Sequence, residues 1–164
     1  MVSMSLAFII IAAILSAYLF LGRNLTRLVN LQQQEVKSRR VLQMFTSDVS
    51  SAIRLTTATD TVMVLSVQTA ASPATVTYTY TAGAANTGTL TRADAAGTVT
   101  LLTGLSTFDF NFFAEDGSAT TSATSIKSAQ FSFTSAVGTA ANGTRAGSTI
   151  VSSRVVLRNK PALL

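Results

Sequence analysis

The first 21 residues of the chain form an unbroken apolar run. Met1–Leu21 contains no charged residue, and the first charge is that of Arg23. As an α-helix, this run would be about 32 Å long, close to the ~30 Å hydrocarbon thickness of a bilayer. The pattern therefore predicts a helix over residues 1–21 that either spans a membrane or packs among copies of itself.

From Gly22 onward the helical pattern becomes amphipathic. No proline precedes Pro73, and Gly22 is the only glycine before Gly83, so the helix can continue to about Arg54. After a polar middle rich in Gln, Lys and Arg, apolar residues recur at spacings of three and four and share one face. The residues expected to pack this helix on a sheet are Leu42, Phe45, Val49 and Ile53.

Short runs with β-strand character follow, separated by turn-rich segments. Ala74–Thr81 alternates large side chains with small ones, and Leu105–Ala114 alternates phenylalanines with polar residues. The other predicted strands are Thr61–Gln68, a hairpin of Thr89–Arg92 with Gly97–Leu102, Lys127–Thr134, and Thr149–Arg158. In the last strand, Val151, Val155 and Leu157 are expected to share the inner face. Loops are expected at Thr120–Ser125 and Gly138–Gly147.

A sheet with one apolar face needs a cover, and the amphipathic helix can supply it. The predicted fold class is therefore α+β, with a long N-terminal helix packed on an antiparallel sheet. Three segments follow: a transmembrane or filament-core helix over 1–21, an amphipathic helix over 22–54, and a β-rich globular head over 55–164.

Composition excludes several kinds of chemistry. The chain has no Cys and no His, which rules out disulfides, thiolate or imidazole metal ligands, and catalysis by either residue. Its seven acidic residues form no pair suited to acid–base catalysis, and Glu115–Asp116 offers too few oxygen ligands for Ca²⁺ and fits a turn better. We therefore expect no enzyme activity, no catalytic residue, no cofactor and no metal site.

The net charge of +5 raises the question of an anionic partner. The basic residues are spread along the chain, and only Lys37–Arg40 forms a cluster, without interleaved aromatic residues. This pattern favours a solvated helix face, so we expect no nucleic-acid partner.

The chain resembles the type IV pilin-like superfamily. The resemblance is carried by the uncharged helix MVSMSLAFIIIAAILSAY and its extension QQQEVKSRRVLQMFTSDV. Within that superfamily it is most similar to minor pseudopilins of the type II secretion J type, through SRRVLQMFTSDVSSAIRL, LLTGLSTFDFNFFAEDG and VSSRVVLRN. The family carries a basic leader, a prepilin peptidase site and a glutamate near the mature N-terminus. Met1 corresponds to a position inside the mature family helix, a few residues past that glutamate.

The resemblance implies a structural subunit, expected to be a minor one, of a type IV pilus-like or pseudopilus filament. Its partners would be other pilin-like subunits, the inner membrane and, for a precursor with a leader, prepilin peptidase. The helices would bundle in the filament core and the β heads would face outward. The core-packing residues would be Phe8, Ile9, Ile10, Ile11, Ile14, Leu15, Leu19 and Phe20.

Two other functions fit the same pattern. One is a single-pass membrane protein whose β head binds a partner and never polymerises, and the other is a major pilin. Arg23 and Arg27 after the apolar run would alone place the head in the cytoplasm. The Ser/Thr-rich head is typical of an extracytoplasmic domain, and a basic leader would favour that orientation. We therefore expect a bacterial inner-membrane protein with its head in the periplasm.

Overall fold

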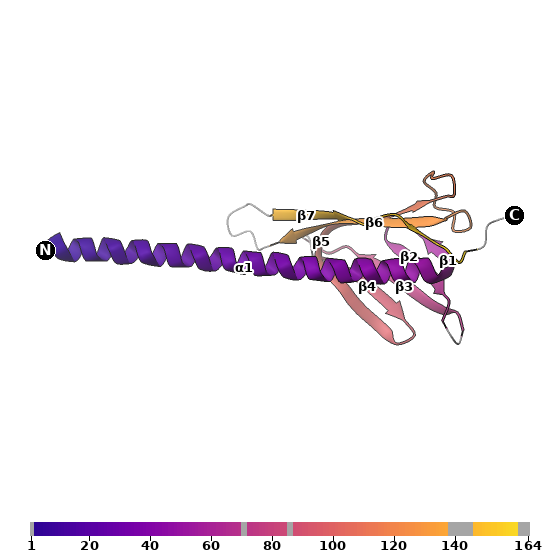
Figure 1. The fold of residues 1–164 in the computed structure, drawn as a ribbon, viewed down its shortest axis with the longest axis horizontal. Coiled ribbons are helices and arrows are strands. Elements are labelled where there is room, and N and C mark those ends of the chain that lie inside the picture. Colours follow the sequence, from indigo (N-terminus) through magenta and orange to yellow (C-terminus); the bar gives the residue numbers. More distant parts are fainter. Residues whose placement is uncertain (1, 70–71, 85–86, 138–145, 161–164) are drawn as a thin grey trace. The chain divides into compact units, whose positions relative to one another are not determined.

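A computed structural model describes residues 2–69, 72–84, 87–137 and 146–160 of the chain (Figure 1). The fold is α+β. The chain divides into two compact units, an N-terminal unit, Met1–Val36, and a C-terminal unit, Lys37–Leu164. The elements are α1 (Val2–Ser51), β1 (Ala52–Ala58), β2 (Val62–Val67), β3 (Ala74–Thr81), β4 (Gly88–Asp94), β5 (Gly97–Phe113), β6 (Ser128–Val137), β7 (Ala146–Val151) and β8 (Val155–Val156).

The strands of the described residues form one antiparallel sheet in which sequence neighbours are also spatial neighbours. The order is β1-β2-β3-β4-β5-β6-β7, and β8 pairs with β6 beside β7. Every connection along this path joins adjacent strands, which makes the sheet a meander.

Strand β5 forms a corner in this sheet. Its first half, up to Leu105, pairs with β4, and its second half, from Leu105 to Phe113, pairs with β6. The change occurs beside Gly104, whose positive φ of 75° bends the strand, and next to a register shift between Leu105 and Thr107. One 17-residue strand therefore joins the two expected strands Gly97–Leu102 and Leu105–Ala114.

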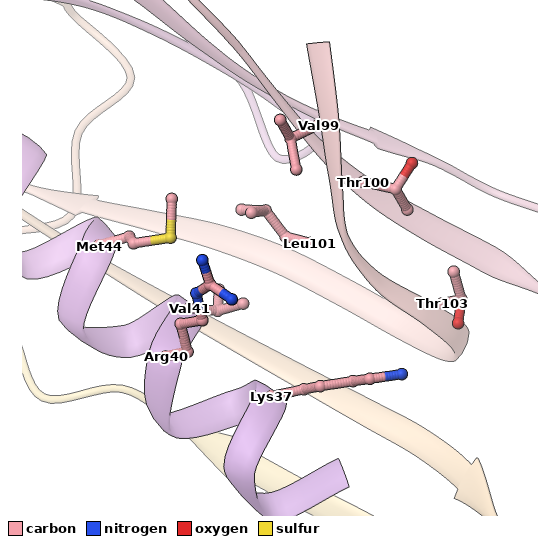
Figure 2. A pocket seen from close by; sticks show the side chains of 8 residues that line it. All are labelled: Lys37, Arg40, Val41, Met44, Val99, Thr100, Leu101 and Thr103. Atoms are coloured by element: carbon pink, nitrogen blue, oxygen red, sulfur yellow. The ribbon is translucent and has the colours of Figure 1, made fainter. Parts of the chain in front are cut away.

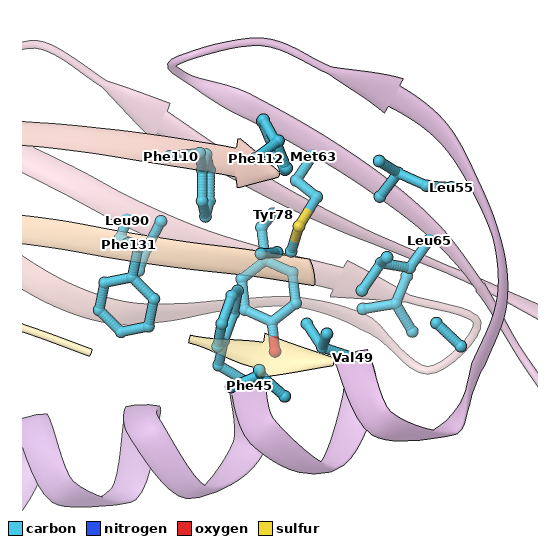
Figure 3. Close-up of a cluster of buried hydrophobic side chains, with 14 of the residues drawn as sticks. Phe45, Val49, Leu55, Met63, Leu65, Tyr78, Leu90, Phe110, Phe112 and Phe131 are labelled. Carbon is cyan, nitrogen blue, oxygen red and sulfur yellow. The ribbon is translucent and has the colours of Figure 1, made fainter. Parts of the chain in front are cut away.

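The core of the C-terminal unit lies between the last turns of α1 and the inner face of the sheet (Figure 3). Phe45 of α1 is the meeting point, with its ring centroid 4.7 Å from that of Phe131, 5.9 Å from Tyr78 and 6.4 Å from Phe110. Edge-to-face and stacked pairs at these separations are favourable beyond the burial of their area. The helix is thus held by aromatic side chains from β3, β5 and β6.

Several strand predictions are confirmed. Strand β3 has the predicted bounds Ala74–Thr81. In Leu105–Ala114, Phe108, Phe110 and Phe112 are buried as predicted, while Asp109 and Asn111 are exposed. The predicted hairpin forms between β4 and β5. Most of the loop expected at Gly138–Gly147 lies outside the described residues.

The predicted helix end at Arg54 is wrong. Helix α1 ends at Ser51, and Ala52 already pairs with Val67 of β2. Ile53 therefore lies on β1 instead of on the helix face. Ser51 Oγ donates to the Ser47 carbonyl at 2.6 Å, while its own carbonyl accepts from the backbone N–H of Gln68. The β-branched residues Ile53, Thr56 and Thr57 then favour the strand.

The predicted last strand is also different. The structure divides it into β7 and β8, and Val151 is 58% exposed whereas Val155 and Leu157 are buried. The cause is Ser152, which is buried and exchanges two hydrogen bonds with Phe131: its N–H donates to the Phe131 carbonyl, and its Oγ accepts from the Phe131 N–H. This local interruption changes which side chains face inward.

Candidate functional site

The N-terminal unit presents an apolar helix surface. Residues Ala7–Thr26 have a mean hydropathy of 1.9, and none of this span is buried, so the helix is long and apolar enough to cross a membrane. The eight residues expected to pack in a filament core are all between 52% and 67% exposed. An apolar surface of this extent on a helix needs lipid or protein around it.

The helix face of the C-terminal unit differs slightly from the expected one. Phe45 and Val49 are buried, and Leu42 is half-buried against the same core. The sequence analysis missed Val41 and Ser38, which are 2% and 4% exposed. Val41, Phe45 and Val49 are spaced four residues apart, and this spacing indicates that the buried face of the helix is centred on them.

A polar cluster joins this helix to the sheet. Asp48 Oδ2 accepts a hydrogen bond from the Tyr78 hydroxyl at 2.7 Å. The same oxygen forms a salt bridge with Arg92 Nε at 2.8 Å. Arg92 Nη1 also pairs with Asp94. One carboxylate on α1 therefore binds side chains from both β3 and β4.

The environment of this cluster shifts the pKa of its members. Burial, strengthened by the neighbouring Asp48 carboxylate, raises the pKa of Tyr78 well above its usual range. The hydrogen bond from Arg92 lowers the pKa of Asp94, and the hydrogen bond to Asp48 raises that of Arg92. These shifts favour the protonated Tyr78, the charged Arg92 and the ionised Asp94, which are the forms that bind one another, so the cluster fixes the helix on the sheet.

A groove opens beside the cluster, between α1 and the first half of β5 (Figure 2). This cationic groove has a volume of about 360 Å³ and is lined by Lys37, Arg40, Val41, Met44, Val99, Thr100, Leu101 and Thr103. Figure 2 shows the side chains of Lys37, Arg40 and Met44 projecting from α1 on the side that faces the strand. The groove combines an apolar floor with two cations and two hydroxyls, which suits an anionic ligand or an acidic segment of a protein.

A lysine clamp lies at the end of the described chain. Lys160 Nζ donates hydrogen bonds to the carbonyl oxygens of Ala123, Thr124 and Ile126 at 2.6–2.7 Å. In return, Lys127 Nζ donates to the Lys160 carbonyl at 3.1 Å. These bonds hold the segment after β8 against the β5–β6 connection.

The turn that contains Glu115 and Asp116, which has too few oxygen ligands for Ca²⁺, is held by its own hydrogen bonds. Asp116 Oδ1 accepts from both the N–H and the Oγ of Ser118, and these bonds lower the pKa of Asp116. No group of three or more Asp, Glu, His or Cys side chains that could hold a metal occurs within the described ranges.

The chain was also compared with known proteins. No family model, no curated protein and no solved structure matches it. Two features of the structure bear on what the chain does, namely the apolar helix surface and the cationic groove.

Proposed function

We propose that this chain is a subunit, and a minor one, of a helical type IV pilus-like or type II secretion pseudopilus filament. The observation that carries the proposal is the exposed apolar surface of α1 before Arg23, on the same helix whose last turns cover the sheet. A helix that served only as a membrane anchor has no need to continue directly into the core of a folded domain. A filament subunit has this need, because its folded domain must move together with the helix that packs in the filament core.

Assembly would move the apolar residues from lipid to a bundle of helices. The transfer of a large side chain from water to an apolar interior contributes about 1.5–3 kcal/mol. Transfer from lipid contributes much less, because lipid is already apolar, so shape complementarity between neighbouring helices decides the packing. Before assembly the subunit would stay in the inner membrane, and a precursor with a leader would be processed by prepilin peptidase.

The groove favours a second candidate function. Its two cations and apolar floor are the features of a ligand site, so a membrane-anchored protein could present it to a partner without polymerising. Crosslinking between helices distinguishes the two functions, because only the filament brings the apolar surfaces of many subunits together.

The experiment uses single cysteines, because the natural chain has none. Ile11→Cys or Leu15→Cys is introduced into the full chain in bacterial membranes, together with the filament machinery, and the cells are oxidised. The filament predicts crosslinked species that contain this chain and depend on that machinery. A matched Arg158→Cys chain, with its cysteine exposed at the end of the C-terminal unit, serves as the control. A strictly monomeric product from both helix positions would contradict the filament.

A further inference from the structure

We propose that the cationic groove binds the acidic turn of a second copy of this chain. The acidic turn is the segment Ala114–Ser118, which follows β5 and carries Glu115 and Asp116. This inference rests on the proposed filament and names a contact between the C-terminal units of neighbouring subunits.

The groove supplies two cationic side chains that form no ion pair with a carboxylate of the described residues. Lys37 and Arg40 line it from one face of α1, and no described residue forms an ion pair with either of them. Its other polar groups are the hydroxyls of Thr100 and Thr103. A volume of about 360 Å³ leaves room for a narrow segment of chain.

The groove also borders an open strand edge. Among the strands that the structure describes, the first half of β5 pairs with β4 alone, since pairing with β6 begins at Leu105. Val99 is 58% exposed there, although it is a large apolar residue. A partner seated in the groove would cover this side chain, which is the usual fate of an exposed apolar residue beside charged ones.

The acidic turn is closed by hydrogen bonds of its own backbone. The N–H of Ala114 donates to the Ser118 carbonyl at 2.9 Å, and that of Gly117 donates to the Ala114 carbonyl at 3.1 Å. Gly117 has a φ of 84°, which favours glycine, and the flanking residues are small. The turn is therefore narrow and ordered before binding, so docking it costs little conformational entropy.

Charge selects this turn among the acidic residues of the C-terminal unit. Those residues are Asp48, Asp60, Asp94, Asp109, Glu115 and Asp116. Asp48 and Asp94 are bound to Arg92, and Asp60 and Asp109 stand alone in sequence. Only the acidic turn offers two adjacent carboxylates to two cations. The nearby Arg154 lies over the Phe113 ring, 3.5 Å from its centroid, and that stacking leaves the carboxylates for a partner.

The two surfaces lie at opposite ends of the C-terminal unit. The groove is at Lys37–Met44, where the unit begins on α1, whereas the β5–β6 connection reaches Ile53–Thr56, just past the end of the helix (Figure 1). The fourteen steps along the helix from Lys37 to Ser51 correspond to about 21 Å along its axis. A contact between opposite ends is heterologous, so each pair of copies leaves one groove and one acidic turn open to further neighbours.

The test joins two full-length chains with different tags in one membrane. One chain carries Thr100→Cys at the groove, the other carries Ala119→Cys beside the acidic turn, and a short bismaleimide links them. Lys37→Glu with Arg40→Glu in the first chain should lower the crosslinked yield by about five- to thirtyfold, from the loss of two exposed ion pairs. Adding Glu115→Lys with Asp116→Lys to the second chain should restore it. A crosslinked yield that is restored when the charges of both chains are reversed cannot result from misfolding of either chain.

The controls separate this contact from the other possibilities. Arg158→Glu in the first chain and Asp109→Lys in the second reverse exposed charges elsewhere and should leave the yield unchanged. Cysteines at Ile11 that crosslink, together with groove and turn cysteines that do not, would overturn the contact and leave the filament standing. Groove and turn cysteines that crosslink without any Ile11 product would overturn the filament alone. Binding of anionic vesicles that is lost in Lys37→Glu with Arg40→Glu, without any copy-to-copy crosslink, would assign the groove to lipid and overturn the contact.

Discussion

At the scale of single residues, Asp48 is the most informative position. It stands three residues after Phe45 and directly before Val49, and its carboxylate binds Tyr78 and Arg92 on the sheet. The side chains of Arg92 and Asp48 are only 16% and 14% exposed, so the ion pair is shielded from water on most sides. A carboxylate in such a place fixes the rotation of the helix, because any other rotation would leave charges unpaired.

Replacing Asp48 should therefore destabilise the C-terminal unit. For Asp48→Asn we expect the free energy of unfolding to fall by about 1–3 kcal/mol, because the amide keeps the shape but leaves Arg92 with one partner fewer. Urea denaturation in detergent, followed by circular dichroism, measures the change. Asp109→Asn, on the exposed face of β5, is the matched control and should stay within about 0.5 kcal/mol of the natural chain. Equal effects of both changes would argue against the proposed role of Asp48.

Tyr78 makes stability depend on alkaline pH. Its pKa is raised in the folded chain, while in the unfolded chain it loses its proton near pH 10. The folded state thus binds more protons above about pH 10, and stability must fall as the pH rises further. We expect Tyr78→Phe to lower stability by about 1 kcal/mol at neutral pH and to flatten this alkaline decline. Tyr80→Phe is the control. It leaves Tyr78 in place, so the loss of stability at alkaline pH should remain.

At the scale of elements, strands with strict alternation were predictable and strands with local interruptions were not. Ala74–Thr81 was predicted with its bounds because every second residue is large. Strand β1 was missed because Ile53 follows Val49 at helical spacing and no glycine or proline separates them. The gap between β7 and β8 depends on hydrogen bonds between Ser152 and Phe131, which are distant in sequence.

The same limit applies to the sites. The apolar surface of α1 was visible in the sequence, because it depends only on neighbouring residues. The cationic groove was not, since it needs the bend at Gly104 to bring Val99 and Leu101 to the helix. Lys37 and Arg40 were read as a solvated face, and they are exposed as expected. Their position beside an apolar floor is a property of the fold.

Phe45 should carry the packing of helix on sheet. It is 1% exposed and touches rings from three strands, so Phe45→Ala should cost about 3–5 kcal/mol in the free energy of unfolding. Val36→Ala on the same helix, 67% exposed, is the control and should have almost no effect. Thermal unfolding in detergent compares the two. A small loss for Phe45→Ala would mean that the helix is not part of the cooperative core.

At the scale of the whole molecule, one helix serves two surroundings. Its described residues before Gly22 carry no charge on any side, and those after Lys37 are apolar mainly toward the sheet. The N-terminal unit therefore depends on lipid or other subunits, whereas the C-terminal unit has a core of its own.

A charge in the apolar run should weaken its hold on the membrane. Ile14 lies near the middle of Ala7–Thr26, where a lysine costs about 2.5–3.5 kcal/mol. We expect Ile14→Lys to reduce the fraction of full-length chain that resists extraction with alkaline carbonate. Ile14→Val, which keeps the site apolar, should be retained like the natural chain. Equal retention of both variants would contradict a membrane span at this site.

The meander has a consequence for how the chain acquires its structure. Each strand from β2 to β7 pairs with the one made just before it, so every new pairing closes a short loop and costs little chain entropy. The sheet can grow in the order of synthesis, and most of its pairing is possible before the last described residues are made. Only the Lys160 clamp must wait for the end of the described chain. This order leaves few unpaired strand edges open to other chains while the sheet is still incomplete.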